Sequence, residues 1–335
     1  MVFKSNADGD LVRLGSFHYL KDSVAHSLYR NGKVLARRDK DGNDAGKEGM
    51  DLEARSMQVH DARCCELTSR RTLDRNGFEL LGDPLAATNR DFLNNELVVR
   101  TYYPKCAELV REATGAKLVT AFDHNIRSAA GKQSKKRIQG GQQVQGPAHV
   151  VHGDYTLASA PQRLRDLAKS PGVNDTFFSF FPDGESLLDA EMVERLIVGG
   201  RFAIINVWRN ITKDPVVTNP LALCDATSVR PENLVVFEIH YHDRIGENYF
   251  AKHAEHHEWF FYPEMTCDEV LLIKQWDSSG EFATSGGIQR DSLMSGSPCT
   301  FSFHSAFEDP TTPIDAPERW SIEVRCAVLY DNVGL

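Results

Sequence analysis

Two histidines and one aspartate have the residue types and the spacing to hold a single metal ion. His152 and Asp154 are separated by one residue, and His304 follows far downstream. Side chains two positions apart in a β-strand point to the same face, so His152 and Asp154 can reach one ion together. Two imidazoles and a carboxylate on one face of iron(II) leave positions open for dioxygen and a chelating co-substrate. These three residues therefore predict a non-heme iron centre.

Histidine is frequent enough in this chain that the triplet needs support from its surroundings. There are 12 histidines, and His-x-Glu also occurs at 253–255 and 256–258. Those two triplets lie in a polar segment that is typical of a surface loop. His152 instead follows two valines, and Asp154 precedes Tyr155, threonine and leucine, which favours a strand. The neighbouring residues therefore favour His152 and Asp154 over the other two triplets as metal ligands.

A second possible metal site follows the spacing of cupin proteins. His240, His242 and Glu247 could bind one ion from a strand and the turn after it. The glycines that flank this pattern in cupins are missing, and residues 243–246 read as a hairpin turn. The site at His152 is preferred, and the cupin-like site is kept as the rival.

Two arginines follow His304 at distances that suit binding of an anionic co-substrate. Arg319 comes 15 residues and Arg325 comes 21 residues after His304. A guanidinium can bind a carboxylate through two parallel hydrogen bonds. In the purely structural alternative, these arginines pair with Glu323 or Asp309 and His304 is an ordinary core residue of an aromatic strand.

Composition narrows the class of protein. The chain has 335 residues, a formal net charge of -9 and 41% hydrophobic residues, so it can bury a sizeable core. The acidic balance argues against nucleic acid as a partner. No apolar stretch approaches the ~20 residues of a membrane span, and the N-terminus lacks an apolar signal core, so we expect a cytoplasmic protein without a membrane partner. Seven cysteines without C-x-x-C spacing fit reduced thiols.

Short strands with few helices between them dominate the chain after residue 150. This pattern predicts a barrel or a two-sheet jelly roll. The expected strands are 11–14, 53–59, 116–122, 202–208, 234–241, 259–262, 270–276, 300–304 and 322–329. The expected helices are 89–113, 157–168 and 187–198.

The expected organisation is one domain over 1–335. Residues 1–90 are charged and turn-rich, and we expect them to form an N-terminal extension packed on a barrel of residues 115–330. Glycine-rich stretches at 131–146 and 278–297 predict loops that could cover the site as lids. No linker divides the chain into two autonomous halves.

Several longer strings, in the same order along the chain, carry a family resemblance. They are 122–127, 204–209, 220–225, 259–266, 268–278, 304–310 and 321–325, together with the strand of His152 and Asp154. Between about residue 50 and about residue 330, the chain resembles the largely fungal hydroxylase/desaturase family. That family includes gibberellin desaturase-like, aspergillic-acid hydroxylase-like and novofumigatonin endoperoxidase-like proteins.

The resemblance implies a fold and a set of cofactors. The fold would be mainly β with flanking helices, a double-stranded β-helix of the jelly-roll or cupin-like barrel type. The cofactors would be iron(II), dioxygen and usually 2-oxoglutarate, with His152, Asp154 and His304 as the metal triad. One of Arg319 and Arg325 would hold the distal carboxylate of 2-oxoglutarate. A small-molecule substrate and a possible homodimer are also implied.

The resemblance also implies residues that line or brace the pocket, and three departures beside the metal. The pocket residues would be Asn206, Trp208, Arg209, His257, Trp259 and Tyr155. The departures are Tyr155-Thr156 in place of a Gln-Thr-like pair, Ser302-Phe303 in place of Thr-Pro, and Asn210 in place of a proline. These departures indicate an unusual substrate or reaction outcome.

The expected function is therefore an iron(II)/2-oxoglutarate-dependent oxygenase of specialised metabolism. It would hydroxylate, desaturate or otherwise oxidise an unactivated C–H bond of a small molecule. Two alternatives stay open. One is a non-heme iron oxidase or cupin-like enzyme that needs no 2-oxoglutarate. The other is a non-catalytic protein that binds small molecules on the same fold.

Overall fold

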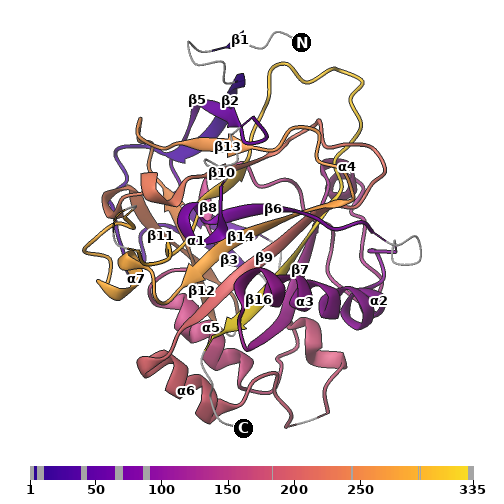
Figure 1. The fold of residues 1–335 in the computed structure, drawn as a ribbon, viewed down its shortest axis with the longest axis vertical. Coiled ribbons are helices and arrows are strands. Elements are labelled where there is room, and N and C mark those ends of the chain that lie inside the picture. The colour runs from indigo at the N-terminus through magenta and orange to yellow at the C-terminus, as the bar shows by residue number, and fades with distance from the viewer. Residues whose placement is uncertain are drawn as a thin grey trace.

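Two β-sheets form the body of the computed structural model (Figure 1), which describes residues 4–5, 11–38, 44–64, 71–85, 91–182, 184–242, 244–292, 294 and 296–330. The larger sheet has the strand order β1-β2-β5-β13-β10-β15-β8-β12-β11-β3-β4. The smaller sheet has the order β6-β14-β9-β16-β7. The predicted two-sheet architecture is confirmed.

The bounds of the elements are as follows. The larger sheet contains β1 (Lys4–Ser5), β2 (Leu11–Leu20), β3 (Leu35–Arg38), β4 (Asp44–Glu48), β5 (Leu52–Asp61), β8 (His152–Gly153), β10 (Leu221–Cys224), β11 (Leu234–His240), β12 (Ile245–Ala251), β13 (Trp259–Phe261) and β15 (His304–Ala306). The smaller sheet contains β6 (Phe78–Gly82), β7 (Leu118–Arg127), β9 (Phe202–Asn210), β14 (Glu269–Asp277) and β16 (Ser321–Leu329). The α-helices are α1 (Leu73–Asn76), α2 (Asn95–Leu97), α3 (Tyr103–Thr114), α4 (Ala129–Gln133), α5 (Ser159–Leu167), α6 (Ala190–Gly199) and α7 (Glu281–Thr284). The remaining turns are η3 (Val98–Tyr102, a π-helix), η4 (Thr176–Ser179), η5 (Ala226–Ser228) and η6 (Pro231–Asn233).

The smaller sheet is covered on its outer face by α3, which lies across β7 and β16 in Figure 1. Alternate residues of β16, from Ile322 to Val328, pack against the helix side in one apolar cluster. The residues between them, including Glu323 and Arg325, face the other sheet because successive strand side chains alternate in direction. The inner face of β16 therefore carries polar side chains into the space between the sheets.

The main apolar core lies between the two sheets. Phe17 of β2 and Trp259 of β13 belong to it, stacked with ring centroids 4.6 Å apart. Phe202 of β9 and Trp276 of β14 join the same cluster from the smaller sheet. Burying such large aromatic side chains contributes strongly to stability. The core thus holds together strands that are far apart in the sequence.

The chain before residue 90 contributes strands to both sheets. β2 pairs with β5 from Val12 opposite His60 to Leu20 opposite Leu52, and β5 pairs in parallel with β13. β6 pairs with β14 at the edge of the smaller sheet. The strands predicted at 11–14 and 53–59 are found. Both are longer than predicted, as β2 and β5 show.

The predicted helix 89–113 differs from the structure at its start. Its first described turn begins at Asn95 and is capped by the Asn94 side chain, which accepts the backbone N–H of Leu97. Residue 89, the predicted cap, lies outside the described residues. The helix ends at Thr114, where Gly115 adopts a positive φ of 66° that favours glycine.

The glycine-rich segment 131–146 is packed against the body of the structure. It begins in α4, and the apolar side chains of Ile138 and Val144 are buried in the cluster beneath α3. Its end runs beside β7, where the backbone N–H of Gln145 donates to the carbonyl of Ile126. Movement of this segment over the site stays a prediction, as does movement of 278–297, part of which lies outside the described residues.

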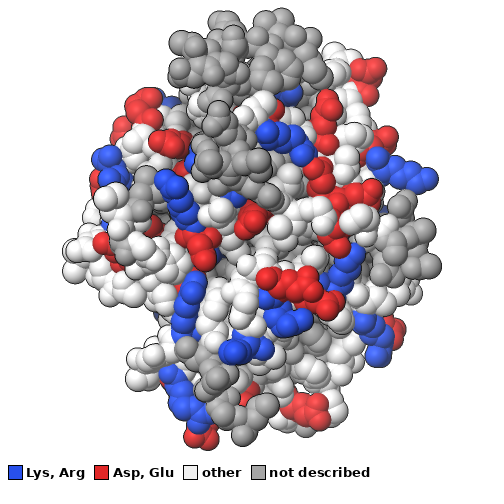
Figure 2. Space-filling model, in the orientation of Figure 1, with Lys and Arg blue, Asp and Glu red and all other residues white. Residues whose placement is uncertain are grey.

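Charged side chains of both signs are interspersed over the face shown in Figure 2. Among the described helices, none is both long and apolar enough to cross a membrane.

Candidate metal centre

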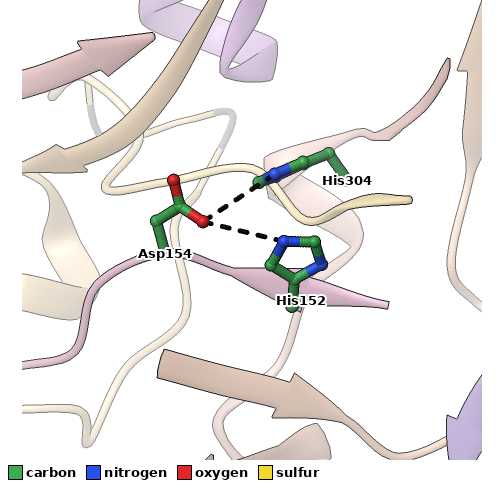
Figure 3. A group of neighbouring side chains, drawn as sticks. All are labelled: His152, Asp154 and His304. Atoms are coloured by element: carbon green, nitrogen blue, oxygen red, sulfur yellow. Dashed lines mark ion pairs between the residues drawn. The ribbon is translucent and has the colours of Figure 1, made fainter. Parts of the chain in front are cut away.

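The two histidines and the aspartate of the predicted triad converge between neighbouring strands. His152 on β8 lies directly opposite His304 on β15. Oδ1 of Asp154 lies 3.6 Å from Nε2 of His152 and 3.9 Å from Nε2 of His304 (Figure 3). One ligand atom from each of the three residues lies within 4.8 Å of the others. Within the described parts of the chain, no other group of three metal-binding side chains comes together.

β8 is only two residues long, so Asp154 lies just beyond the strand instead of inside it. The backbone N–H of Asp154 donates to Oε1 of Gln275 at 3.1 Å, which holds the residue beside β14. Between the two ligands, a Cβ on Gly153 would lie 3.1 Å from the ring of Phe301. The small middle residue of the His-x-Asp motif therefore allows the strand to pack closely against that ring.

Each imidazole ring has a polar neighbour at Nδ1, the ring nitrogen that does not face Asp154. Nδ1 of His152 lies 2.7 Å from the carbonyl oxygen of Val150 and therefore donates a proton to it. That bond places the lone pair of His152 on Nε2, the atom that faces Asp154. Nδ1 of His304 lies 3.5 Å from Nε2 of Gln275, and the His304 ring is also hydrogen-bonded to the backbone of Ser302. Such outer partners commonly orient the histidine ligands of metals.

The protonation states suit a cation. Burial, with the neighbouring His304, lowers the pKa of His152 to about 4. Burial also lowers the pKa of His304. Burial alone would raise the pKa of Asp154, but the Arg325 guanidinium and the two histidines hold it well below its usual range. At neutral pH, two neutral imidazoles and one carboxylate therefore face one another, the form in which these side chains bind metals.

Arg325 contacts the aspartate of the candidate centre. Its Nε donates to Oδ2 of Asp154 at 3.3 Å, and its Nη1 donates to Oδ2 of Asp123 at 3.0 Å. Nη2 lies 3.8 Å from Oε1 of Glu323. These carboxylates raise the pKa of Arg325 above its ordinary value although burial opposes them. The guanidinium is thus already surrounded by carboxylates of the protein.

Arg319 has a different environment. It is 3% exposed, its Nη1 donates to the carbonyl of Asn219, and its guanidinium lies over the ring of Trp208 at 5.9 Å. Its Nε is buried without a hydrogen-bond partner. Burial lowers its pKa to about 9. No carboxylate of the described residues forms an ion pair with it, so Arg319 is a buried cation that lacks an anion.

Three residues that the sequence analysis did not single out lie around Arg319. Oγ of Ser321 and Nδ1 of His149 are buried without hydrogen-bond partners. Arg127 lies opposite Ser321 on the neighbouring strand, and its charge contributes to the lowered pKa of Arg319. The alternation of strand residues could have pointed to Ser321, which is two positions after Arg319, whereas only the fold brings His149 and Arg127 there.

Among the predicted pocket residues, Asn206, Trp208 and Tyr155 lie close to this centre. Nδ2 of Asn206 donates to Oδ2 of Asp154 at 3.0 Å. The Trp208 ring lies beneath Arg319. Tyr155 follows Asp154 directly and is buried, and burial raises the pKa of its phenol to about 12.

The other three predicted pocket residues have contacts elsewhere. The Arg209 guanidinium bonds to Tyr102, to Asp83 and to the carbonyl of Cys267, on the opposite face of β9. Nε1 of Trp259 donates to the hydroxyl of Tyr19 at 2.8 Å, within the core. Nδ1 of His257 lies 3.3 Å from the same hydroxyl, and burial lowers its pKa to about 3. Contact of these side chains with substrate stays a prediction.

The rival cupin-like site is not assembled. Nε2 of His240 lies 2.9 Å from Oε2 of Glu238. The other oxygen of Glu238, Oε1, accepts hydrogen bonds from two backbone N–H groups. Glu247 instead pairs with Arg30 at 2.6 Å and accepts the hydroxyl of Thr156 at 2.8 Å. Because Glu247 and His240 are each bound to other side chains, they do not form a common ligand set.

Comparison with known proteins finds relatives that are named as oxygenases. The chain is 29% identical over 296 residues to the alpha-ketoglutarate-dependent dioxygenase phiK of a fungus (Fungal sp.). This match covers 87% of this chain and 90% of that protein. The chain is 28% identical to the Fe(II)/2-oxoglutarate-dependent dioxygenase nvfI of Aspergillus novofumigatus, over 81% of this chain and 82% of that protein. A third relative, 44% identical over 195 residues, is an uncharacterized protein in the dcmA 3' region of Methylophilus leisingeri. That match covers 58% of this chain and 88% of the relative.

The solved structure of the iron and alpha-ketoglutarate-dependent endoperoxidase NvfI has the same fold. The TM-score is 0.71 at 23% identity, over 95% of this chain and 98% of that chain. This match confirms the predicted double-stranded β-helix, and the relatives confirm the resemblance to fungal hydroxylases and desaturases. A family model also matches residues 17–179 and 183–329. The chain therefore belongs to the family described as the oxidoreductase/YMDC permease-like domain, YDMC.

Proposed function

We propose that this protein is an iron(II)- and 2-oxoglutarate-dependent oxygenase that acts on a small molecule of specialised metabolism. The observation that carries the proposal is the convergence of His152, Asp154 and His304 in the protonation states that a metal requires. Two imidazoles and one carboxylate form the ligand set of non-heme iron oxygenases. The relatives named for iron(II) and 2-oxoglutarate support the choice of metal and co-substrate.

The protein would hold the reactants and exclude water, while the bound iron, with 2-oxoglutarate and dioxygen, supplies the power to oxidise an unactivated C–H bond. His152, Asp154 and His304 would bind the iron from one side. Around them, the rings of Phe250 and Phe301 pack close to His152 and Gly153. Aromatic walls of this kind keep competing water away from a reactive centre.

Arg319 is our choice for the residue that binds the distal carboxylate of 2-oxoglutarate. A buried cation without an anion is costly, and a bound carboxylate would offset that cost. The unpartnered Nε of Arg319 and Oγ of Ser321 could both donate to such a carboxylate. Arg325 is the weaker candidate because Asp154 and Asp123 already occupy its guanidinium.

Anaerobic titration of the metal-free protein with iron(II), and then with 2-oxoglutarate, tests the proposed function. We expect one iron per chain and a weak visible charge-transfer band when 2-oxoglutarate is added. Iron binding without this band would favour a 2-oxoglutarate-independent oxidase. Absence of iron binding would contradict the proposal and leave the non-catalytic alternative. Release of carbon dioxide in step with product would then link the centre to oxidation.

Replacing Arg319 by leucine is expected to weaken 2-oxoglutarate binding by on the order of 100-fold, while iron affinity stays the same. The estimate follows from the about 2–5 kcal/mol lost when one partner of a buried charge pair is removed. Calorimetric titration of the manganese(II)-loaded protein under nitrogen measures the change. Arg165→Leu, which removes an exposed arginine paired with Glu194, is the control. Unchanged 2-oxoglutarate affinity in Arg319→Leu would shift the role to Arg127 or Arg325.

A cytoplasmic location and a homodimer are further proposals. Four described cysteines, Cys106, Cys224, Cys299 and Cys326, are buried free thiols, which suits a reducing compartment. Light scattering on the purified protein measures whether two chains associate.

A further inference from the structure

We propose that Arg325 and Asn206 are positioning residues that restrict Asp154 to binding the metal through a single oxygen. This inference rests on the proposed function, because it requires Asp154 to be a metal ligand. It concerns the number of coordination positions left open for the co-substrate and dioxygen.

The two oxygens of Asp154 have different partners. Oδ2 accepts hydrogen bonds from Nε of Arg325 at 3.3 Å and from Nδ2 of Asn206 at 3.0 Å. Oδ1 faces Nε2 of His152 and Nε2 of His304, at 3.6 and 3.9 Å. Two donors therefore hold one oxygen away from the histidines, and the other oxygen is directed toward them.

Both donors are also bonded to other acids. Nδ2 of Asn206 donates to Oε1 of the buried Glu323 at 2.7 Å, so one amide nitrogen bonds to two carboxylates. Arg325 bonds to the half-buried Asp123, whose Oδ1 accepts the hydroxyl of Thr176 at 3.0 Å. The side chain of Asp154 is only 8% exposed, so either donor that turned away would leave a largely buried carboxylate short of a partner, which costs free energy.

The fold places these donors in register across three neighbouring strands. Arg325 on β16 lies opposite Asn206 on β9 and opposite Asp123 on β7. Paired residues in an antiparallel sheet direct their side chains to the same face. Asp154, by contrast, lies beyond the end of β8 and has no partner in the larger sheet's ladder. Its orientation therefore depends on the side chains of the smaller sheet.

Without the hydrogen bonds from Arg325 and Asn206, the carboxylate of Asp154 could rotate and bind the metal with both oxygens. One of the three open positions would then be filled by the protein. A chelating co-substrate needs two of those positions, so binding of 2-oxoglutarate should suffer as well as binding of the metal. Loss of an outer partner typically weakens metal binding by about 10- to 100-fold.

The test compares Asn206→Ala, Arg325→Gln and Arg325→Lys with the unmodified protein. Cobalt(II) affinity, the visible spectrum at cobalt saturation, and 2-oxoglutarate affinity of the cobalt-loaded protein are measured under nitrogen. We expect cobalt and 2-oxoglutarate affinities to fall by about 10- to 100-fold in Asn206→Ala and Arg325→Gln. The spectrum should also change, which a loss of overall stability alone would not cause. Arg325→Lys keeps the positive charge, so its affinities should lie between those of the unmodified protein and those of Arg325→Gln. It replaces Arg325→Gln if that variant does not fold.

Asn210→Ala is the matched control. The family resemblance placed Asn210 beside the metal, but its amide donates to the carbonyls of Asp214 and Met265 and not to the candidate centre. It is buried on the same strand as Asn206. Asn210 lies opposite Ser321, so it serves as a control for the metal readings alone. We expect Asn210→Ala to lose stability and to keep the cobalt affinity and the cobalt spectrum of the unmodified protein. If Asn210→Ala weakens cobalt binding as much as Asn206→Ala does, the positioning role is overturned.

The outcomes separate this inference from the function on which it rests. An unmodified protein that binds no cobalt would overturn both. An unmodified protein that binds cobalt and 2-oxoglutarate, with Asn206→Ala and Arg325→Lys within twofold of it and spectra unchanged, would overturn the positioning role alone.

Discussion

Iron(II) binding is expected to fall by on the order of 100- to 1000-fold, and turnover to vanish, when His304 is replaced by alanine. Structural zinc sites bind with about 10–16 kcal/mol over about four ligands, or ~2.5–4 kcal/mol for each ligand. The loss should be near the upper end here, because the cavity left by His304 is enclosed by buried neighbours. Competition with a coloured chelator under nitrogen measures the affinity.

The control for this prediction is His240→Ala. It removes a histidine of the rival cupin-like site, where the imidazole is bound to Glu238. We expect iron affinity within about twofold of the unmodified protein. Loss of iron in His240→Ala but not in His304→Ala would move the metal to the rival site and reject the triad.

Replacing Arg209 by leucine is expected to reduce the free energy of unfolding by about 3–5 kcal/mol, the usual cost of removing one partner from a buried ion pair. The guanidinium is fully buried and joins the Tyr102 hydroxyl, Asp83 and the backbone carbonyl of Cys267. A leucine would leave the Tyr102 hydroxyl and the Cys267 carbonyl without this donor, and Asp83 would keep its ion pair with Lys105. Urea unfolding followed by circular dichroism measures the change.

Arg165→Leu serves as the control again, since Arg165 and Glu194 form an exposed pair on α5 and α6. Exposed pairs typically contribute less than about 1 kcal/mol. If Arg209→Leu costs no more than Arg165→Leu, the bracing role of Arg209 is wrong. If Arg209→Leu instead stays stable and loses substrate binding, the predicted pocket role is supported.

Local patterns were sufficient for much of the fold. The apolar strands around 202–208, 270–276 and 322–329 were found close to their predicted bounds, because continuous apolar runs mark buried strands. The segment 300–304 was different, as only its last residue belongs to a strand, β15. The hydroxyl of Ser302 instead donates to the carbonyl of Cys224 at 2.7 Å, a contact between residues far apart in the chain. No local pattern contains that contact.

The sequence by itself determined the chemistry of the candidate site. One residue separates His152 from Asp154, and this spacing predicted that both side chains can reach one metal ion. The family strings then identified His304 as the third residue. Ligand chemistry depends on residue type, and residue type is visible in the sequence.

Only the tertiary structure distinguished the surroundings of the two arginines. Arg319 and Arg325 are separated by six residues, but their surroundings come from other strands. Arg325 meets Asp123 and Asp154, whereas Arg319 is buried over Trp208 and forms no ion pair with a carboxylate of the described residues. An arginine is the same residue in either setting, and the free energy of a buried cation depends on the charges that the fold brings beside it.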